Sequence, residues 1–237
     1  MEEERSAEFQ LLSSYFKNTL EISEEEYLKI FKAIYYNYWL CDGKKVEQVS
    51  DQLSSLLSYS REPLLFVKYF LKTLDREWDS IDFLRLDKFY LLIRKIFKEI
   101  CKWKDFTSLG DLLLEILLSE KSKRGLKLFL VQILAEEILV FKYSAPLLRI
   151  YAKLTSTDVY KVDEHLLKII KSKRISVQNK QKILKISSKN SIKKFEKILD
   201  FFKMQNKLKK FKKKKKKTVQ WSKDLEKIKF FSKKDRI

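Results

Sequence analysis

The chain has 237 residues, of which 45% are hydrophobic and 14% aromatic, enough for a sizeable core and too many for a wholly disordered protein. Three glycines and two prolines are too few for the turns of a β-sandwich, a β-barrel or a Rossmann-type fold, so the composition indicates an all-α protein. The net charge of +20 is confined to one end, because residues 1–170 hold 26 basic and 27 acidic side chains and residues 171–237 hold 26 and 5.

Apolar residues that recur with a period of about 3.6 predict a succession of amphipathic helices joined by short polar turns. Ser23, Ser144 and Thr157 are predicted to cap helix starts, and Gly43 and Gly110 are predicted to mark helix ends. The predicted helices span residues 5–20, 24–40, 45–59, 62–77, 81–103, 106–119, 122–142, 145–155, 157–171, 177–187 and 190–210.

Short connections favour antiparallel packing of consecutive helices, so we expect stacked helical hairpins that form a HEAT-like α-solenoid with a basic C-terminal tail. Residues 1–170 are predicted to form the helical-repeat body, and residues 171–210 to form basic helices that continue it. Residues 211–237 are predicted to be a lysine-rich, extended tail, since a run of like charges without apolar residues resists folding.

The sequence offers little material for catalysis or for a metal site. Cys41 and Cys101 lie far apart, without a CxxC pair, and are interpreted as reduced, packed thiols. His165 is the single histidine and is interpreted as a helix-surface residue, while Glu136 and Glu137 are interpreted as solvated or salt-bridged. Phosphate-binding loops and hydrolase motifs are absent, so we expect no catalytic residues, no metal and no cofactor. The polar start and the lack of an apolar run of about 18 residues favour an intracellular, soluble protein.

The tail instead has the composition of a nucleic-acid-binding segment. Lysines neutralise phosphates with little sequence preference, and the aromatic residues among them can stack on unpaired bases, so RNA is the expected partner. A nuclear import signal, or a generic binder of RNA or of a membrane surface, would explain the same lysines. The candidate RNA-binding residues are Lys207, Lys209, Lys210, Lys212, Lys213, Lys214, Lys215, Lys216 and Lys217.

A short motif at the end of the lysine run suggests an alternative function. The sequence from Lys217 to Trp221 resembles the docking motif of protein phosphatase one partners, in which a basic residue precedes an aliphatic residue and an aromatic one. Strand addition would place Val219 and Trp221 in apolar pockets and Lys217 near an acidic rim. The alternative is therefore an adaptor that recruits this phosphatase.

Three segments of the body carry a family resemblance. The stretch DREWDSIDFLRLDKFYLLIR, from Asp75 to Arg94, resembles the most characteristic part of the ribosomal RNA processing protein 1 family. KIFKAIYYNYWLCDGK, from Lys29 to Lys44, resembles that family's helix with a tyrosine and tryptophan cluster. KSKRGLKLFLVQILAEEI, from Lys121 to Ile138, resembles a later helix, and the three segments occur in the family's order.

This resemblance implies a non-enzymatic factor of the nucleus and nucleolus that is required for processing the precursor of the large-subunit ribosomal RNAs. It implies a helical-repeat scaffold within early large-subunit pre-ribosomes. The partners that it implies are precursor rRNA and other assembly factors, namely a β-propeller factor, a Brix-domain factor and a further RNA-binding factor.

Residues in the matching segments have two interpretations. Those with apolar side chains are most simply core, namely Trp78, Ile81, Leu84, Leu86, Phe89, Tyr90 and Ile93. The charged residues around them form either a structural network of salt bridges and helix caps, with Asp82 near a helix start, or a partner-docking surface. Four aromatic residues in five positions cannot all face one core, and the outward ones would be good interface anchors. The candidate partner-binding residues are Tyr35, Tyr38, Trp39, Arg76, Trp78, Asp79, Arg85 and Lys88.

Overall fold

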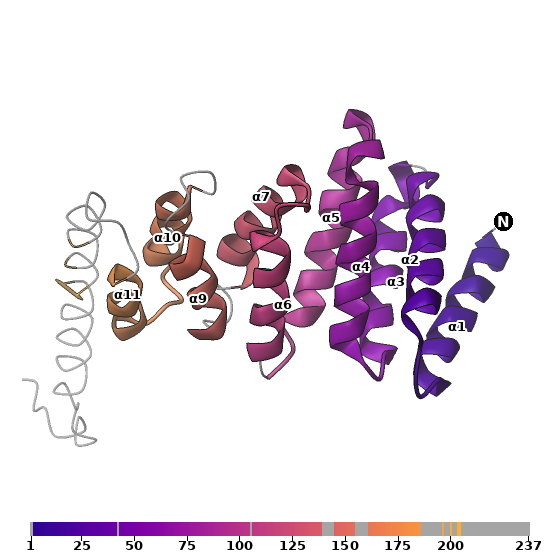
Figure 1. Cartoon of the computed structure of the whole chain (residues 1–237), viewed down its shortest axis with the longest axis horizontal. Helices are drawn as coiled ribbons and strands as arrows, with labels where there is room; N and C mark the ends of the chain where they lie inside the picture. Colours follow the sequence, from indigo (N-terminus) through magenta and orange to yellow (C-terminus); the bar gives the residue numbers. More distant parts are fainter. Residues whose placement is uncertain are drawn as a thin grey trace, which may run out of the picture.

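The computed structural model describes residues 2–41, 43–104, 106–138, 145–154 and 161–185, and the isolated residues 196, 200, 203 and 204. Within these residues the regular structure is helical and no strand occurs, which confirms the all-α class. The helices stand in a row, in chain order, from α1 at one end to α11 at the other (Figure 1). This row of stacked helices is the predicted solenoid.

Among the described residues, the first half of the row consists of five long helices. Two short 3₁₀ turns lie among them, η1 between α2 and α3 and η2 between α4 and α5. The turns span Gly43–Lys45 and Trp78–Ser80. The helices are α1 (Glu2–Asn18), α2 (Glu24–Trp39), α3 (Val46–Tyr59), α4 (Pro63–Glu77) and α5 (Phe83–Ile100).

The second half consists of shorter helices and includes one π-helical segment, η3, which continues α7 over Leu134–Ile138. The helices here are α6 (Thr107–Leu118), α7 (Arg124–Ile133), α9 (Ala145–Leu154), α10 (Val162–Lys171) and α11 (Val177–Leu184). The predicted helix over residues 190–210 lies almost entirely outside the described residues.

Local capping explains why several helices begin where the sequence predicts. Ser23 starts α2 with a capping box, in which its Oγ accepts from the Glu26 amide at 3.3 Å and the Glu26 carboxylate accepts from the Ser23 amide at 2.9 Å. Ser176 caps α11 with a single hydrogen bond, in which its Oγ accepts from the Asn179 amide at 3.2 Å. The predicted caps Ser144 and Thr157 lie outside the described residues.

The prediction that Gly110 marks a helix end is wrong, because Gly110 lies inside α6, close to its start. Gly110 faces α9, where a Cβ would make an ordinary van der Waals contact, 3.5 Å from the backbone oxygen of Pro146. Gly43, by contrast, begins the η1 turn shortly after α2 ends. A glycine pattern alone does not distinguish a helix stop from a close helix contact.

A single core runs along the row, and its main contacts join elements that are close in chain order. In the first half, α1 packs on α3, α2 on α4 and α3 on α5; in the second half, α6 packs on α9, and α10 on η3, α9 and α11. Aromatic rings fill the first half of the core, with Tyr27 stacked on Tyr69 at 5.0 Å and Phe31 against Phe66 at 4.8 Å. Leucine and isoleucine fill much of the second half.

Two further predictions concern the thiols and the membrane. Cys41 is buried, Cys101 is partly buried, and neither forms a disulfide, which agrees with their interpretation as packed thiols. In the part of the chain that the structure describes, no helix has the length and apolar character to cross a bilayer. The division into segments 1–170, 171–210 and 211–237 stays a prediction.

Candidate docking surface

The end of α2 and the start of α5 lie together, although they are nearly 50 residues apart in the sequence. The Trp39 ring lies under the Arg85 guanidinium, whose central carbon is 4.0 Å from the ring centroid. Arg85 also pairs with Asp82, and the Asp82 carboxylate caps α5 by accepting from the Arg85 amide at 3.1 Å. We call this contact region, formed by Trp39, Asp82 and Arg85, the α2–α5 joint. Its geometry combines a cation–π contact with a helix cap.

Lys88 ties the same two helices together through the backbone. Its ammonium donates to the carbonyl of Trp39 at 2.6 Å and to the carbonyl of Cys41 at 3.1 Å. These carbonyls lie at the C-terminal end of α2, where backbone acceptors have no partner within the helix and a positive charge is favourable. Lys88 therefore acts as a C-terminal cap for α2 that is supplied by another helix.

Three of the candidate partner-binding residues are buried in the structure, namely Tyr35, Tyr38 and Trp78. The Tyr38 hydroxyl donates to the Lys88 carbonyl at 2.7 Å and lies 2.8 Å from the Ser50 hydroxyl, and burial raises the pKa of Tyr38 to about 12. The Tyr35 hydroxyl lies 3.1 Å from the Ser80 hydroxyl. These side chains hold the body together and present no free anchor to a partner.

The charged candidates Arg76 and Asp79 are exposed, but each has a local ion pair. Arg76 pairs with Glu77 at 2.8 Å, and Asp79 pairs with Lys123 at 2.5 Å. The backbone of Lys123 also donates to the Asp75 carboxylate at 2.7 Å, so α4 and η2 are fastened to the start of α7. Most of the charge in this region is engaged in salt bridges and caps.

Two of the large side chains left exposed near the joint, those of Phe83 and Leu84, were not among the candidate partner-binding residues. Phe83 and Leu84, the first two residues of α5, are each 88% exposed, and Tyr36, next to Tyr35 on α2, is 48% exposed. The prediction that Leu84 belongs to the core is wrong. Residues three and four positions apart share one face of a helix. The buried face of α5 that contains Phe89 therefore continues toward the helix start at positions 86, 85 and 82, and positions 83 and 84 lie on the opposite side. Extending that period to the helix start would have found them.

We call Phe83 and Leu84 the apolar patch. Adjacent large apolar side chains that are almost fully exposed are unusual on a soluble domain and typify contact sites. Asp82 fixes their position, because the capped first turn directs positions 83 and 84 away from the stripe that packs on the body. The arrangement provides apolar anchors beside the Arg85 guanidinium and the Trp39 ring.

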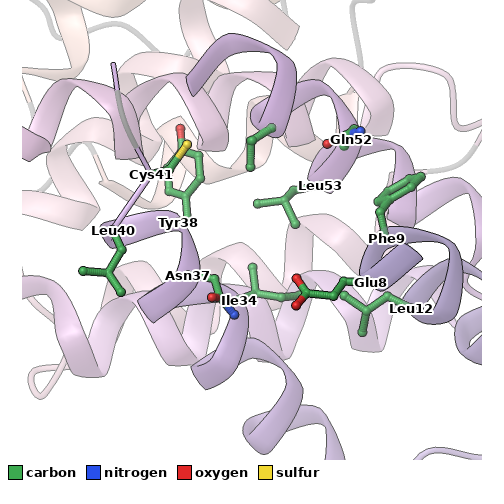
Figure 2. Close-up of a pocket in the computed structure, with 11 residues that line it drawn as sticks. Glu8, Phe9, Leu12, Ile34, Asn37, Tyr38, Leu40, Cys41, Gln52 and Leu53 are labelled. Atoms are coloured by element: carbon green, nitrogen blue, oxygen red, sulfur yellow. The ribbon is translucent and has the colours of Figure 1, made fainter. Parts of the chain in front are cut away.

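A pocket lies beside the last turns of α2, between α1, α2 and α3 (Figure 2). Its volume is about 170 Å³, and Figure 2 shows the labelled side chains around the open space. The lining is mostly apolar, with the Glu8 carboxylate and the Asn37 and Gln52 amides as its polar groups. Helical periodicity does not reveal this pocket, since its walls come from three helices.

The prediction that His165 is a helix-surface residue is wrong, because its ring is partly buried and lies 6.4 Å from the Tyr151 ring. Its Nδ1 is buried without a hydrogen-bond partner among the described residues. Burial, aided by the nearby Lys168, lowers the pKa of the imidazole. Lys168 pairs with Glu136 at 2.6 Å, which confirms the salt-bridge interpretation of Glu136.

The candidate RNA-binding lysines at 207, 209, 210 and 212–217, and the phosphatase-docking candidates Lys217, Val219 and Trp221, lie outside the described residues. Among the residues that are described, no three histidine, cysteine or carboxylate side chains gather in an arrangement suited to a metal ion.

Comparison with known proteins gives a consistent picture. A model of the family described as nucleolar protein Nop52 matches residues 2–235. Ribosomal RNA processing protein 1 homolog B of Mus musculus is 32% identical over 135 residues, which are 51% of this chain and 19% of that protein. Homolog A of Homo sapiens is 31% identical over 130 residues, 49% of this chain and 28% of that protein. The Dictyostelium discoideum homolog is 35% identical over 96 residues, 39% of this chain and 19% of that protein.

The stacked helices define the class of the molecule as an all-α helical solenoid. The chain belongs to the Nop52 family of nucleolar proteins, since the family model spans nearly all of it. The resemblance to ribosomal RNA processing protein 1 is thereby confirmed. For each of these three relatives, the matched region covers less than a third of the relative's own length.

Proposed function

We propose that this protein is a non-catalytic factor of ribosome biogenesis that acts in the nucleolus and is required for processing the large-subunit rRNA precursor. The observation that carries the proposal is the Nop52 family match over residues 2–235, together with relatives that are named ribosomal RNA processing proteins. The solenoid supports a scaffolding role, because stacked helices offer an extended surface to several partners at once.

In this proposal the body binds other large-subunit assembly factors, of the β-propeller, Brix-domain and RNA-binding types, within early pre-ribosomes. The apolar patch is the part of the body that we assign to a protein partner. Arg85 and Trp39 beside the patch belong to the residue types that dominate protein interfaces. The lysine-rich tail, including the run at 212–217, holds precursor rRNA through its phosphates.

The first test is purification of the tagged full chain from its own cells, followed by identification of the RNA and proteins that accompany it. We expect large-subunit rRNA precursors and early assembly factors to be enriched. Recovery of bulk RNA alone would overturn the proposal and favour a generic basic binder of RNA or of membrane surfaces.

The apolar patch is tested in the same purification with a double variant, Phe83→Ser with Leu84→Ser. We expect at least one assembly factor to be lost, while the helical content stays unchanged because both side chains are exposed. The matched control replaces Leu11 and Leu118 by serine, since both are exposed leucines on other helices. Equal recovery of every factor with both variants would exclude the patch as a docking site.

The second candidate function rests on the motif from Lys217 to Trp221, which has the order of residues used to dock protein phosphatase one. In this case the chain recruits the phosphatase to the pre-ribosome. Replacing Val219 and Trp221 by alanine is expected to abolish phosphatase capture and to leave pre-ribosome association intact. Phosphatase capture that survives the double replacement would contradict the motif.

A further inference from the structure

The C-terminal end of the described solenoid carries positive charge without any acidic residue. Residues 166–185 include seven lysines and arginines and no aspartate or glutamate. This differs from the rest of the body, where basic and acidic side chains nearly balance. Protein surfaces that only need to be soluble mix both signs, so a run of one sign on an ordered surface indicates an oppositely charged ligand.

The side chains of α11 are sorted into a buried face and a polar face. Lys180 and Ile183 are buried toward the body. The exposed positions are spaced by three and four residues, which places them on one side of the helix. They consist of two amides and two ammonium groups, namely Gln178, Gln181, Lys182 and Lys185.

The turn between α10 and α11 adds further exposed cations to the same end. Lys171 ends α10, and Lys173 and Arg174 follow in the turn. The turn is ordered by hydrogen bonds, since the Arg174 amide donates to Ser172 Oγ at 3.2 Å and Ser176 caps α11. We call the exposed side chains of this turn and of α11 the basic end face.

Ion pairing changes abruptly at this point in the chain. Lys168, one turn before the end of α10, is neutralised by Glu136 of η3 at 2.6 Å. Within the described ranges, no carboxylate forms an ion pair with Lys171, Lys173, Lys182 or Lys185. Lys168 is therefore paired within the body, whereas these four lysines are exposed.

We propose that the basic end face binds the phosphodiester backbone of RNA, without preference for base sequence. The inference rests on the proposed association with rRNA and assigns part of that association to the folded body, at the end of the row opposite α1 (Figure 1). Lysines neutralise phosphates as point charges, and glutamine amides donate to phosphate and ribose oxygens. Residues 166–185 contain no phenylalanine, tyrosine or tryptophan, so the face has no ring on which to stack a base.

The test compares two full-chain variants that carry the same reduction in charge. The first replaces Lys171, Lys173, Lys182 and Lys185 by glutamine. The control replaces four other lysines by glutamine. These are exposed lysines of the near-neutral part of the body, namely Lys17, Lys32, Lys44 and Lys98. Binding of a fluorescent single-stranded RNA of mixed sequence is measured by anisotropy over a range of salt concentrations. Circular dichroism verifies that both variants stay folded.

For the first variant we expect the affinity for RNA to fall at least tenfold. The salt slope, which is the slope of log affinity against log salt concentration, is expected to decrease in magnitude by roughly 0.7 for each phosphate that is no longer neutralised. The control is expected to change affinity less than threefold. Equal salt slopes for the two variants would overturn the inference. Binding to vesicles of phosphatidylcholine with phosphatidylserine that depends on the four lysines, combined with unchanged RNA binding, would also overturn it.

A third variant, with Lys212 to Lys217 replaced by glutamine, separates this inference from the proposed function. If only this variant changes the salt slope, the tail alone holds RNA; the inference then fails while the proposed function stands. If the unmodified chain binds RNA in vitro but does not co-purify with rRNA precursors from cells, the proposed function fails. The inference about the basic end face is then tested only by the RNA affinity and salt slope of the first variant and its control.

Discussion

The indole of Trp78 occupies the space in which a side chain at position 125 would lie: a Cβ on Gly125 would come within 2.5 Å of Trp78 Nε1. Trp78 belongs to η2 and Gly125 to the start of α7, so the absence of a side chain lets the two segments touch. The Asp79–Lys123 ion pair and the Asp75–Lys123 hydrogen bond close the same contact. This contact links the first half of the solenoid to the second.

The first prediction concerns that contact. Gly125→Ala is expected to lower the free energy of unfolding by about 1–3 kcal/mol, because the buried indole must move to admit the methyl group. Gly43→Ala is the matched control, since no heavy atom lies within 4 Å of a Cβ there, and it is expected to be neutral or slightly stabilising. Urea unfolding followed by circular dichroism measures both. Equal stability of the two variants would contradict the role of the contact.

The second prediction concerns the buried hydroxyl of Tyr38. Tyr38→Phe removes the hydrogen bond to the Lys88 carbonyl and the contact with Ser50, and it leaves a buried carbonyl with one partner fewer. We expect a decrease of about 1–2 kcal/mol in the free energy of unfolding. Tyr36→Phe alters an exposed ring two positions away and is expected to change stability by less than about 0.5 kcal/mol. A neutral Tyr38→Phe would show that the hydroxyl contributes nothing to the joint.

The third prediction concerns the cap that Lys88 provides to α2. Lys88→Met keeps most of the side-chain volume but removes the donor to the Trp39 and Cys41 carbonyls. We expect the free energy of unfolding to fall by about 2 kcal/mol, the usual cost of removing a charged hydrogen-bond donor from partly buried acceptors. Lys32→Met, at an exposed position of α2, is the control and should stay within about 0.5 kcal/mol of the native chain. Denaturation midpoints at fixed salt distinguish the two.

The fourth prediction concerns pH. Burial lowers the pKa of His165 in the folded chain, whereas the unfolded chain keeps the ordinary value near 6.5. At pH values between the folded and the unfolded pKa, the unfolded state binds more protons than the folded state. The contribution of the neutral His165 to the free energy of unfolding is therefore fully present above about pH 6.5 and is lost as the pH falls through the folded pKa. The charged groups that lie near the imidazole are Glu136, Glu164, Lys161 and Lys168. We expect His165→Leu to flatten the dependence of the unfolding free energy on pH just below about pH 6.5. An unchanged dependence would exclude His165 as its source, since the chain has no other histidine.

The sequence predicted the helices well because their signals are local. The 3.6-residue period and the Ser23 cap place α2 within a residue of its observed bounds, and residues 45–59 and 62–77 match α3 and α4 equally closely. Gly110 and Leu84 show where local signals fail. Gly110 lies inside α6 against Pro146 of α9, and Leu84 lies on the side of α5 opposite the stripe that the rest of the helix buries. Each outcome depends on the surrounding structure and not on the residue type.

The candidate site was predictable in its location but not in its roles. The sequence supplied candidate residues in both the end of α2 and the start of α5, but periodicity carries no information on contacts such as that between Lys88 and Trp39, 49 positions apart. As a result, the buried rings of Tyr35 and Tyr38 were proposed as anchors and the exposed Phe83 was overlooked. Whether the tail lysines and the motif at Val219 and Trp221 act as proposed stays a prediction.

The order of packing along the row has a consequence for how damage spreads through the molecule. Because α11 packs mainly on α10, and α10 on η3 and α9, this end can open while α1 to α5 keep every one of their own main contacts. A substitution that unfolds α11 therefore leaves the apolar patch intact. The two proposed binding regions can therefore be lost one at a time, and a chain whose basic end face has opened is expected to keep the apolar patch on α5 in place.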